Sequence, residues 1–127
     1  MHYFIFNIND IESELDNRLN AKKWPFYRNT KNVEHMVQGD LVVFYQAGAG
    51  FHVFAGEAVV LETFLGPKKR YAKFSSVVKW KNKVDIKKIY EELEIIRNPT
   101  YYGAYLAGGV LKLNKKDYDL IISKSKK

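Results

Sequence analysis

The sequence predicts one α+β domain with a strongly curved, mainly antiparallel sheet or partial barrel and peripheral helices. Strand patterns dominate the middle of the chain and helix patterns lie towards its ends, without the strand-helix alternation typical of a parallel sheet. The 127 residues are 46% hydrophobic, which suffices for one core without disulfides. We expect a single domain over residues 1–123 and a disordered basic tail over 124–127.

The first quarter of the chain indicates a strand followed by a helix. Residues 3–7 form a short apolar run typical of a buried strand. Residues 9–12 have the spacing of a helix cap, and Leu15 and Leu19 then fall on one helical face. Residues 22–32 are polar and contain a proline, so we expect an irregular loop there.

The middle of the chain predicts three strands. Residues 41–46 and 51–61 are apolar, β-branched and aromatic runs joined by a glycine-rich link, a pattern typical of a hairpin. Gly56 indicates a bulge or the close approach of another backbone. Residues 71–82 alternate between apolar side chains, Val78 among them, and basic ones, so we expect a strand with one wet, basic face.

The last third predicts two helices around a short extended segment. We expect the first helix to begin at Asp85 and end before Pro99. Its apolar stripe comprises Ile86, Ile89, Tyr90, Leu93 and Ile96. Residues 110–113 are extended in this prediction, and Asn114 with Asp117 has the spacing that starts a final helix.

Composition argues against several function classes. The chain has no cysteine, which excludes thiolate nucleophiles, disulfides and thiolate zinc sites. Its three histidines lack metal-ligand spacing, and its serines and glycines match neither a nucleophile elbow nor a phosphate loop. We therefore expect a non-enzyme with no catalytic residue, metal or cofactor. Without a signal-peptide pattern or a long apolar run, we also expect a cytoplasmic protein with no membrane partner.

Positive charge is concentrated in the second half of the chain. Residues 1–67 carry a net charge of −3 and residues 68–127 carry +10. Such an excess attracts polyanions and gives salt-dependent affinity for phosphates. We expect the basic turn and strand face made by Lys68, Lys69, Arg70 and Lys73 to contact a nucleic-acid backbone; an ordinary solvated lysine surface is the alternative.

Six parts of the chain follow one another in a characteristic order: residues 3–7, Trp24 in its polar loop, 37–45, 54–58, 93–98 and 107–121. In this order and spacing they resemble the EVE domains of the PUA-like superfamily. The likeness spans nearly the whole chain. It implies a PUA-like curved barrel, a relationship to YTH domains, which hold a methylated adenine in an aromatic cage, and recognition of a modified base in DNA or RNA.

The resemblance and the aromatic residues together predict a pocket for a planar base. The resemblance makes Trp24 one wall of that pocket, although Pro25 departs from the small residue usual after this tryptophan. The expected ligand-binding residues are Asn7, Trp24, Phe26, Tyr45, Tyr101, Tyr102 and Gly108. For each ring, core packing is the alternative interpretation. Two other functions stay open: a domain that binds a small molecule or nucleoside, and a protein-interaction module that uses the basic face.

Overall fold

A six-stranded mixed sheet organises the computed structural model, which describes residues 1–9, 14–26, 30, 32–48, 51–106 and 109–125. The strands are β1 (Tyr3–Asn9), β2 (Lys23–Phe26), β3 (Leu41–Gly48), β4 (Phe51–Leu65), β5 (Arg70–Asp85) and β6 (Val110–Leu113). The helices are α1 (Glu14–Ala21), α2 (Tyr102–Tyr105) and α3 (Lys115–Ser125), and the 3-10 turns are η1 (Val33–His35), η2 (Ile86–Lys88) and η3 (Pro99–Tyr101).

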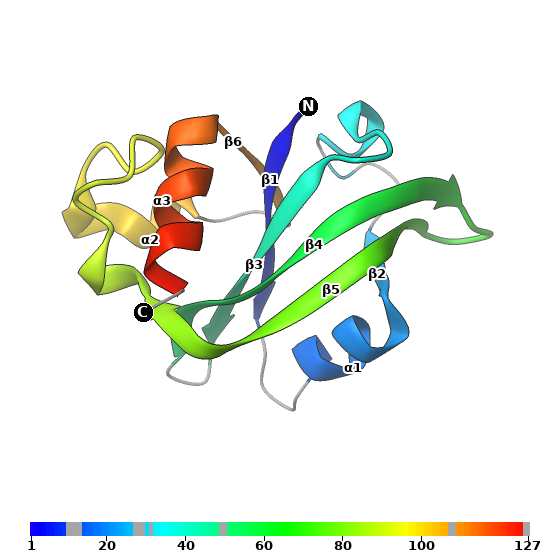
Figure 1. Ribbon diagram of the computed structural model, residues 1–127. Coiled ribbons are helices and arrows are strands. Elements are labelled where there is room, and N and C mark those ends of the chain that lie inside the picture. Colours follow the sequence, from blue (N-terminus) through cyan, green and yellow to red (C-terminus); the bar gives the residue numbers. More distant parts are fainter. Residues whose placement is uncertain (10–13, 27–29, 31, 49–50, 107–108, 126–127) are drawn as a thin grey trace.

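The sheet has the strand order β2-β5-β4-β3-β1-β6. β1 pairs with β3 in parallel, and the other neighbouring strands are antiparallel. Figure 1 shows the sheet curled into a half-barrel, with α1 on one side and α2 and α3 on the other. The predicted fold class, a curved and mainly antiparallel α+β domain, is confirmed.

Two hydrophobic cores lie on opposite sides of the central strands, because successive side chains of a strand alternate between its faces. The barrel core includes Phe4, Phe6, Leu19, Trp24, Phe44 and Phe74. The helix core, which lies under α3, includes Ile5, Val43, Tyr45, Trp80, Leu93 and Ile121. Alternation along β1 and β3 thus supplies both cores from the same two strands.

β4 and β5 change their pairing register at several points, and this lets β5 serve both cores. A register shift lies between Phe54 and Gly56 in the pairing of β4 with both β3 and β5, and further shifts follow between Val59 and Glu62 in the pairing with β5. Ala72 of β5 belongs to the barrel core, whereas Trp80 belongs to the helix core. A Cβ added at Gly56 would lie 2.6 Å from the Val78 carbonyl oxygen, so the predicted bulge and close approach are both confirmed. The prediction that Val78 points inward is wrong: it is 48% exposed because the register shifts intervene.

The loop predicted over residues 22–32 is wrong in part, because residues 23–26 form β2. This strand pairs with the start of β5, where Trp24 lies opposite Ala72. β2 is an edge strand, a position that tolerates Pro25 because a missing donor there breaks no ladder on the open side. Residues 27–29 and 31 of the predicted loop lie outside the described residues. Residues 10–13 also lie outside them, so most of the predicted cap of the first helix is not described. Leu15 and Leu19 of α1 are buried as predicted.

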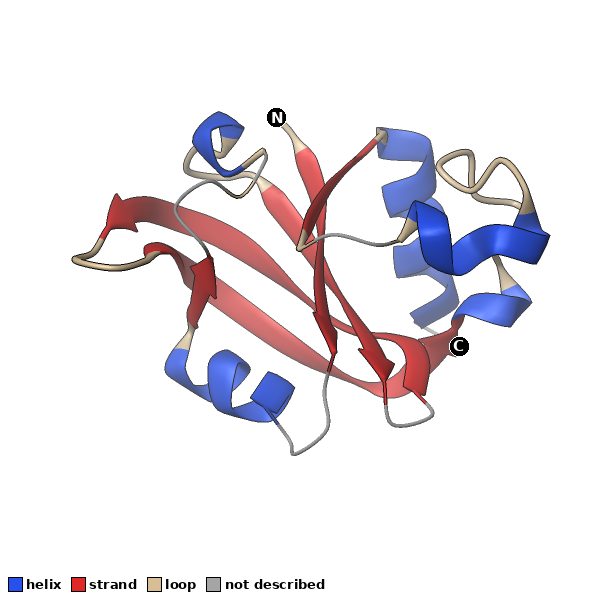
Figure 2. Cartoon of the chain, turned by 180° about the vertical axis from the view of Figure 1, so that it is seen from behind, coloured by secondary structure: helices blue, strands red, loops and turns tan. Residues whose placement is uncertain are grey.

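The helix predicted from Asp85 is also wrong: beyond η2, the chain makes turns, visible in Figure 2 beside α3. The buried carboxylate of Asp117 accepts hydrogen bonds from the backbone nitrogens of Glu94 and Ile95, at 2.8 and 2.9 Å. Those donors would otherwise bond to carbonyls one helical turn earlier. Ile86, Ile89, Leu93 and Ile96 are buried, so the predicted apolar stripe is correct although its backbone is not helical.

The C-terminal elements agree with the sequence patterns. β6 pairs with β1, and Asn114 Oδ1 caps α3 by accepting from the backbone nitrogen of Asp117 at 2.8 Å. α3 continues through Ser125, one residue past the predicted start of the tail at 124, and residues 126–127 lie outside the described part. None of the described helices is long and apolar enough to cross a membrane.

Replacing Gly56 by Ala should destabilise the protein by about 1–3 kcal/mol, because the added methyl group collides with a backbone carbonyl that cannot rotate away. Gly103→Ala is the matched control, since nothing lies within 4 Å of an added Cβ there. Gly103 is in α2, so alanine should leave stability unchanged or raise it by up to about 1 kcal/mol. Urea unfolding of both variants measures the difference, and equal midpoints would contradict the tight contact.

Candidate functional site

A small cavity lies where α1, β2 and the end of β1 meet. Its volume is about 240 Å³, and it is lined by Asn7, Arg18, Trp24, Pro25, Phe26, Thr30, Lys69 and Gly109. Drug-sized ligands occupy cavities of roughly 300–1,000 Å³, so this one suits a single small planar group. Asn7, Trp24 and Phe26, three of the predicted ligand-binding residues, meet here with the predicted phosphate contact Lys69.

Trp24 supports the cavity from below and presents little of its ring. It is 2% exposed, and its indole stacks on Phe44 with ring centroids 5.2 Å apart and planes 17° apart. The guanidinium carbon of Arg18 lies over the same indole, 4.7 Å from its centroid. Contacts with Phe44 and Arg18 therefore help to bury the indole of Trp24 almost completely.

Arg18 is the lining residue that sequence reasoning missed. It projects from α1, where its Nε donates to Glu14 Oε1 at 3.2 Å, and its side chain is 23% exposed. A guanidinium is a flat, permanently charged group with several donors, and it stacks well on aromatic rings and bases. The spacing of Glu14 and Arg18 indicated an ion pair on a helix. Nothing in the sequence indicated that the pair lies against Trp24.

Asn7 is held by two hydrogen bonds at the end of β1. Its backbone nitrogen donates to the Gly109 carbonyl at 3.0 Å, and its side-chain Nδ2 donates to the Leu106 carbonyl. Among the described residues, no group donates to its Oδ1. The amide is therefore oriented by Leu106, and its oxygen is available to accept a hydrogen bond from a ligand in the cavity.

The described lining of the cavity contains no tyrosine, so the predicted pairing of Trp24 with a tyrosine on the opposite wall is not seen there. Tyr45 follows Phe44 along β3, so its side chain points to the opposite face, into the helix core. There its ring centroid lies 5.0 Å from that of Phe54. Burial there, with Tyr102 and Asp85 nearby, raises the pKa of the Tyr45 hydroxyl far above its usual value.

The other two tyrosines also lie apart from the cavity. Tyr102 packs against Tyr90 and His52, at 5.7 and 6.0 Å between ring centroids, and Tyr101 is 63% exposed. Gly108 lies outside the described residues, although its neighbour Gly109 lines the cavity. A role of these residues in binding stays a prediction.

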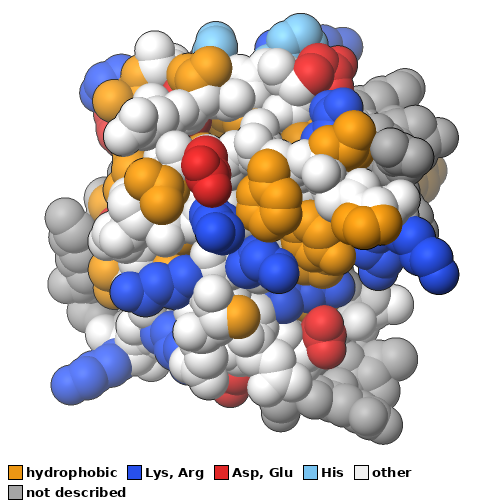
Figure 3. Space-filling view, turned by 90° about the vertical axis from the view of Figure 1, so that its right-hand side faces the viewer, with side chains coloured by type: hydrophobic (Ala, Val, Ile, Leu, Met, Phe, Trp, Pro, Cys, Tyr) orange, Lys and Arg blue, Asp and Glu red, His pale blue; other side chains and the backbone are white. Residues whose placement is uncertain are grey.

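The predicted phosphate-contacting residues lie at the turn between β4 and β5 and along the start of β5. Figure 3 shows basic and hydrophobic side chains together on this side of the molecule. Arg70 Nη1 lies 3.9 Å from Glu34 Oε2, and Lys73 Nζ lies 3.9 Å from Glu62 Oε1. Lys68 is exposed, and Lys69 lines the cavity. Two of the four charges are thus partly neutralised by carboxylates, and the backbone-contact role stays a prediction.

The cavity lining combines several polar groups with apolar side chains. Its lining provides an amide oxygen, a guanidinium, an amine and a hydroxyl around aromatic and proline side chains, without a carboxylate or imidazole among the described lining residues. In the described part of the chain, no three acidic or histidine side chains lie close enough to hold a metal ion. The arrangement can orient a flat polar group by stacking and by hydrogen bonds to its edge.

Several solved structures have a similar fold. A hypothetical protein from Leishmania major is similar with a TM-score of 0.73 and 18% identity, over 99% of this chain and 95% of that one. Human THYN1, solved in complex with DNA containing 5-methylcytosine, has a TM-score of 0.68 and 12% identity, over 100% and 99%. The Mmi1 YTH domain has a TM-score of 0.58 and 10% identity, over 99% and 96%.

These likenesses establish the fold, and they confirm the resemblance to EVE and other PUA-like domains at that level. No protein-family model matches the sequence. A search among curated proteins also finds no match.

Replacing Trp24 by Ala should destabilise the protein by about 3–5 kcal/mol, because it empties a core position between Phe44 and Arg18. Tyr101→Ala, which removes an exposed ring, should change stability by less than about 0.5 kcal/mol. Thermal and urea unfolding compare the two variants. A Trp24→Ala protein as stable as the wild type would contradict the structural role of this ring.

Proposed function

From the fold shared with EVE and YTH domains, we propose that this chain is a non-catalytic nucleic-acid-binding domain that recognises a modified base. The cavity carries this proposal, because it combines a stacking surface, an edge acceptor and a nearby amine in a volume that suits one base. The comparison that supports it most is human THYN1, whose structure contains DNA with 5-methylcytosine. The choice between DNA and RNA is left to the experiment below.

In the proposed complex the base stacks on the guanidinium of Arg18. The indole of Trp24 has no open face, so its role is to hold this guanidinium flat from behind. Stacking of this kind contributes about 1–3 kcal/mol per base. Phe26, held edge-on by Phe6 at 5.1 Å, contributes an apolar wall.

The edge of the base is recognised by Asn7. Its Oδ1 accepts a hydrogen bond from a ring N–H or an exocyclic amine, while Leu106 fixes the amide. Lys69, at the rim, lies where the phosphate next to an extruded base would pass. A methyl group on the base is detected through its fit against the apolar part of the lining.

Arg18→Lys should reduce the preference for a modified over an unmodified oligonucleotide by about tenfold, because lysine keeps the charge but loses the stacking plane. The salt dependence of binding should not change, since no charge is lost. Fluorescence anisotropy with DNA and RNA oligonucleotides that carry 5-methylcytosine or N6-methyladenine measures both quantities. The same experiment on the wild type identifies the preferred nucleic acid and base.

Arg97→Lys is the matched control, because Arg97 is exposed and remote from the cavity lining. It should leave the preference unchanged. A wild-type protein that binds every modified and unmodified oligonucleotide equally would disprove base recognition. Binding of free modified nucleosides with no effect of salt would favour the small-molecule alternative.

Asn7→Ala should weaken binding of the preferred base by about 1 kcal/mol, the usual contribution of one neutral hydrogen bond. Asn17→Ala is its control, since Asn17 is an exposed residue of α1. Titration with the preferred oligonucleotide compares the two, after unfolding curves have shown that both variants are folded. Equal losses of affinity in the two variants would contradict a contact between Asn7 and the base.

A further inference from the structure

We call the cavity at Asn7, Arg18 and Trp24, in which a base is proposed to bind, the base cavity. A second concave surface runs along β5, apart from it. Two adjoining cavities of about 620 and 420 Å³ share Lys81 and Asn82 in their linings. The two cavities adjoin at these residues, and we call their combined lining the lysine groove. None of its described lining residues lines the base cavity.

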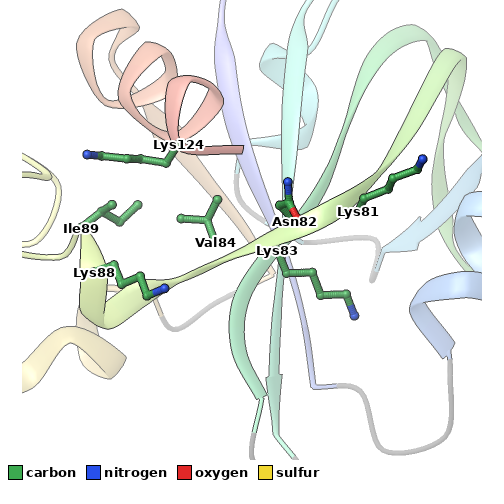
Figure 4. Close-up of a pocket in the computed structure, with 7 residues that line it drawn as sticks. All are labelled: Lys81, Asn82, Lys83, Val84, Lys88, Ile89 and Lys124. Atoms are coloured by element: carbon green, nitrogen blue, oxygen red, sulfur yellow. The ribbon is translucent and has the colours of Figure 1, made fainter. Parts of the chain in front are cut away.

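The lysine groove gathers cations from three elements of the fold. Its lysines are Lys79, Lys81 and Lys83 of β5, Lys88 of η2 and Lys124 of α3. Figure 4 shows the wider cavity, with Val84 and Ile89 between Lys88 and Lys124. The amines are spread along the groove and do not converge on one point, so the surface suits an extended row of negative charges better than a single anion.

Three of these lysines have no acidic partner. Among the described residues, no carboxylate lies within 4.0 Å of the amines of Lys81, Lys88 or Lys124. Lys79 is 3.7 Å from Asp16, and Lys83 donates to Gln46 Oε1 at 3.3 Å.

The carboxylate in the groove lining belongs to Glu57, which accepts a hydrogen bond from Trp80 Nε1 at 2.8 Å. Arg70 and Lys73, in contrast, each lie near a carboxylate. The groove is therefore the less neutralised of the two basic surfaces, and a bound polyanion would relieve the mutual repulsion of its lysines.

We propose that the lysine groove binds the phosphodiester backbone of a nucleic acid without regard to base. All of its cations are lysines, which bind phosphates as point charges and impose no fixed geometry, as binding along a backbone without regard to base requires. The choice of nucleic acid as the ligand rests on the proposed function. The groove supplies affinity, and the base cavity supplies discrimination.

α1 links the two surfaces. Arg18 of this helix lines the base cavity, while Asp16 and Asn20 hold the amine of Lys79 at the start of the groove, at 3.7 and 2.7 Å. A strand that occupies both surfaces would therefore turn at this helix. Such a path needs a flexible backbone, which makes single-stranded nucleic acid the ligand of the combined surface.

The test compares two triple variants that remove the same charge. The groove variant carries Lys81→Gln, Lys88→Gln and Lys124→Gln. The control carries Lys22→Gln, Lys112→Gln and Lys115→Gln, at exposed positions outside the groove lining. Anisotropy titrations with an unmodified single-stranded oligonucleotide at several salt concentrations give the slope of log affinity against log salt. For single strands each phosphate contact contributes about 0.7 to this slope.

The groove variant should lose about 2 from the slope, and the control less than about 0.5. Preference for a modified base should stay at the wild-type value in the groove variant, whereas Arg18→Lys changes preference and not slope, so the two proposals fail separately. Equal slopes in the two triple variants would overturn the groove assignment. A second outcome would also overturn the assignment: pyrophosphate competes in the wild type but not in the groove variant, while both proteins bind the oligonucleotide equally. That outcome would favour a small phosphorylated ligand.

Discussion

The close approach of Gly56 to the Val78 carbonyl is the contact on which the arrangement of both surfaces depends. It accompanies the register shifts that carry β5 from the barrel core at Ala72 to the helix core at Trp80. Without these shifts one face of β5 would stay on one core along its whole length. With them, the start of the strand supports β2 and the base cavity, and its second half forms the lysine groove.

Two buried carboxylates hold segments that have little regular structure. Asp40 accepts from the backbone nitrogens of His2 and Val37, both at 2.9 Å, and so ties the start of β1 to the turn before β3. Asp117 holds the segment after η2 against α3 in the same way. Backbone donors that lack a helix or sheet partner must find an acceptor when buried. These two side chains supply it, and Asp40 thereby steadies the parallel strand pair that carries Asn7.

The stack of Phe44, Trp24 and Arg18 connects the core to the candidate site. Phe44 belongs to β3, Trp24 to β2 and Arg18 to α1, so the guanidinium is positioned by three elements that pack together only in the folded domain. In the proposed function, Trp24 acts through Arg18. The stack explains how a tryptophan can be both a core residue and necessary for base recognition.

The sequence by itself determined the strands other than β2, most of the buried faces and the capped final helix, because these follow from spacings of two to four residues. Tertiary structure decided the rest. The stripe at Ile86 and Ile89 is buried without a helix because Asp117, far along the chain, takes the backbone donors of the intervening segment. Trp24 lies in a strand because its segment pairs with β5. Tyr45 lies in the helix core, away from the cavity, because successive side chains of β3 point to opposite faces of the sheet. No local pattern encodes such contacts, since their energy comes from residues that meet only when the sheet curls.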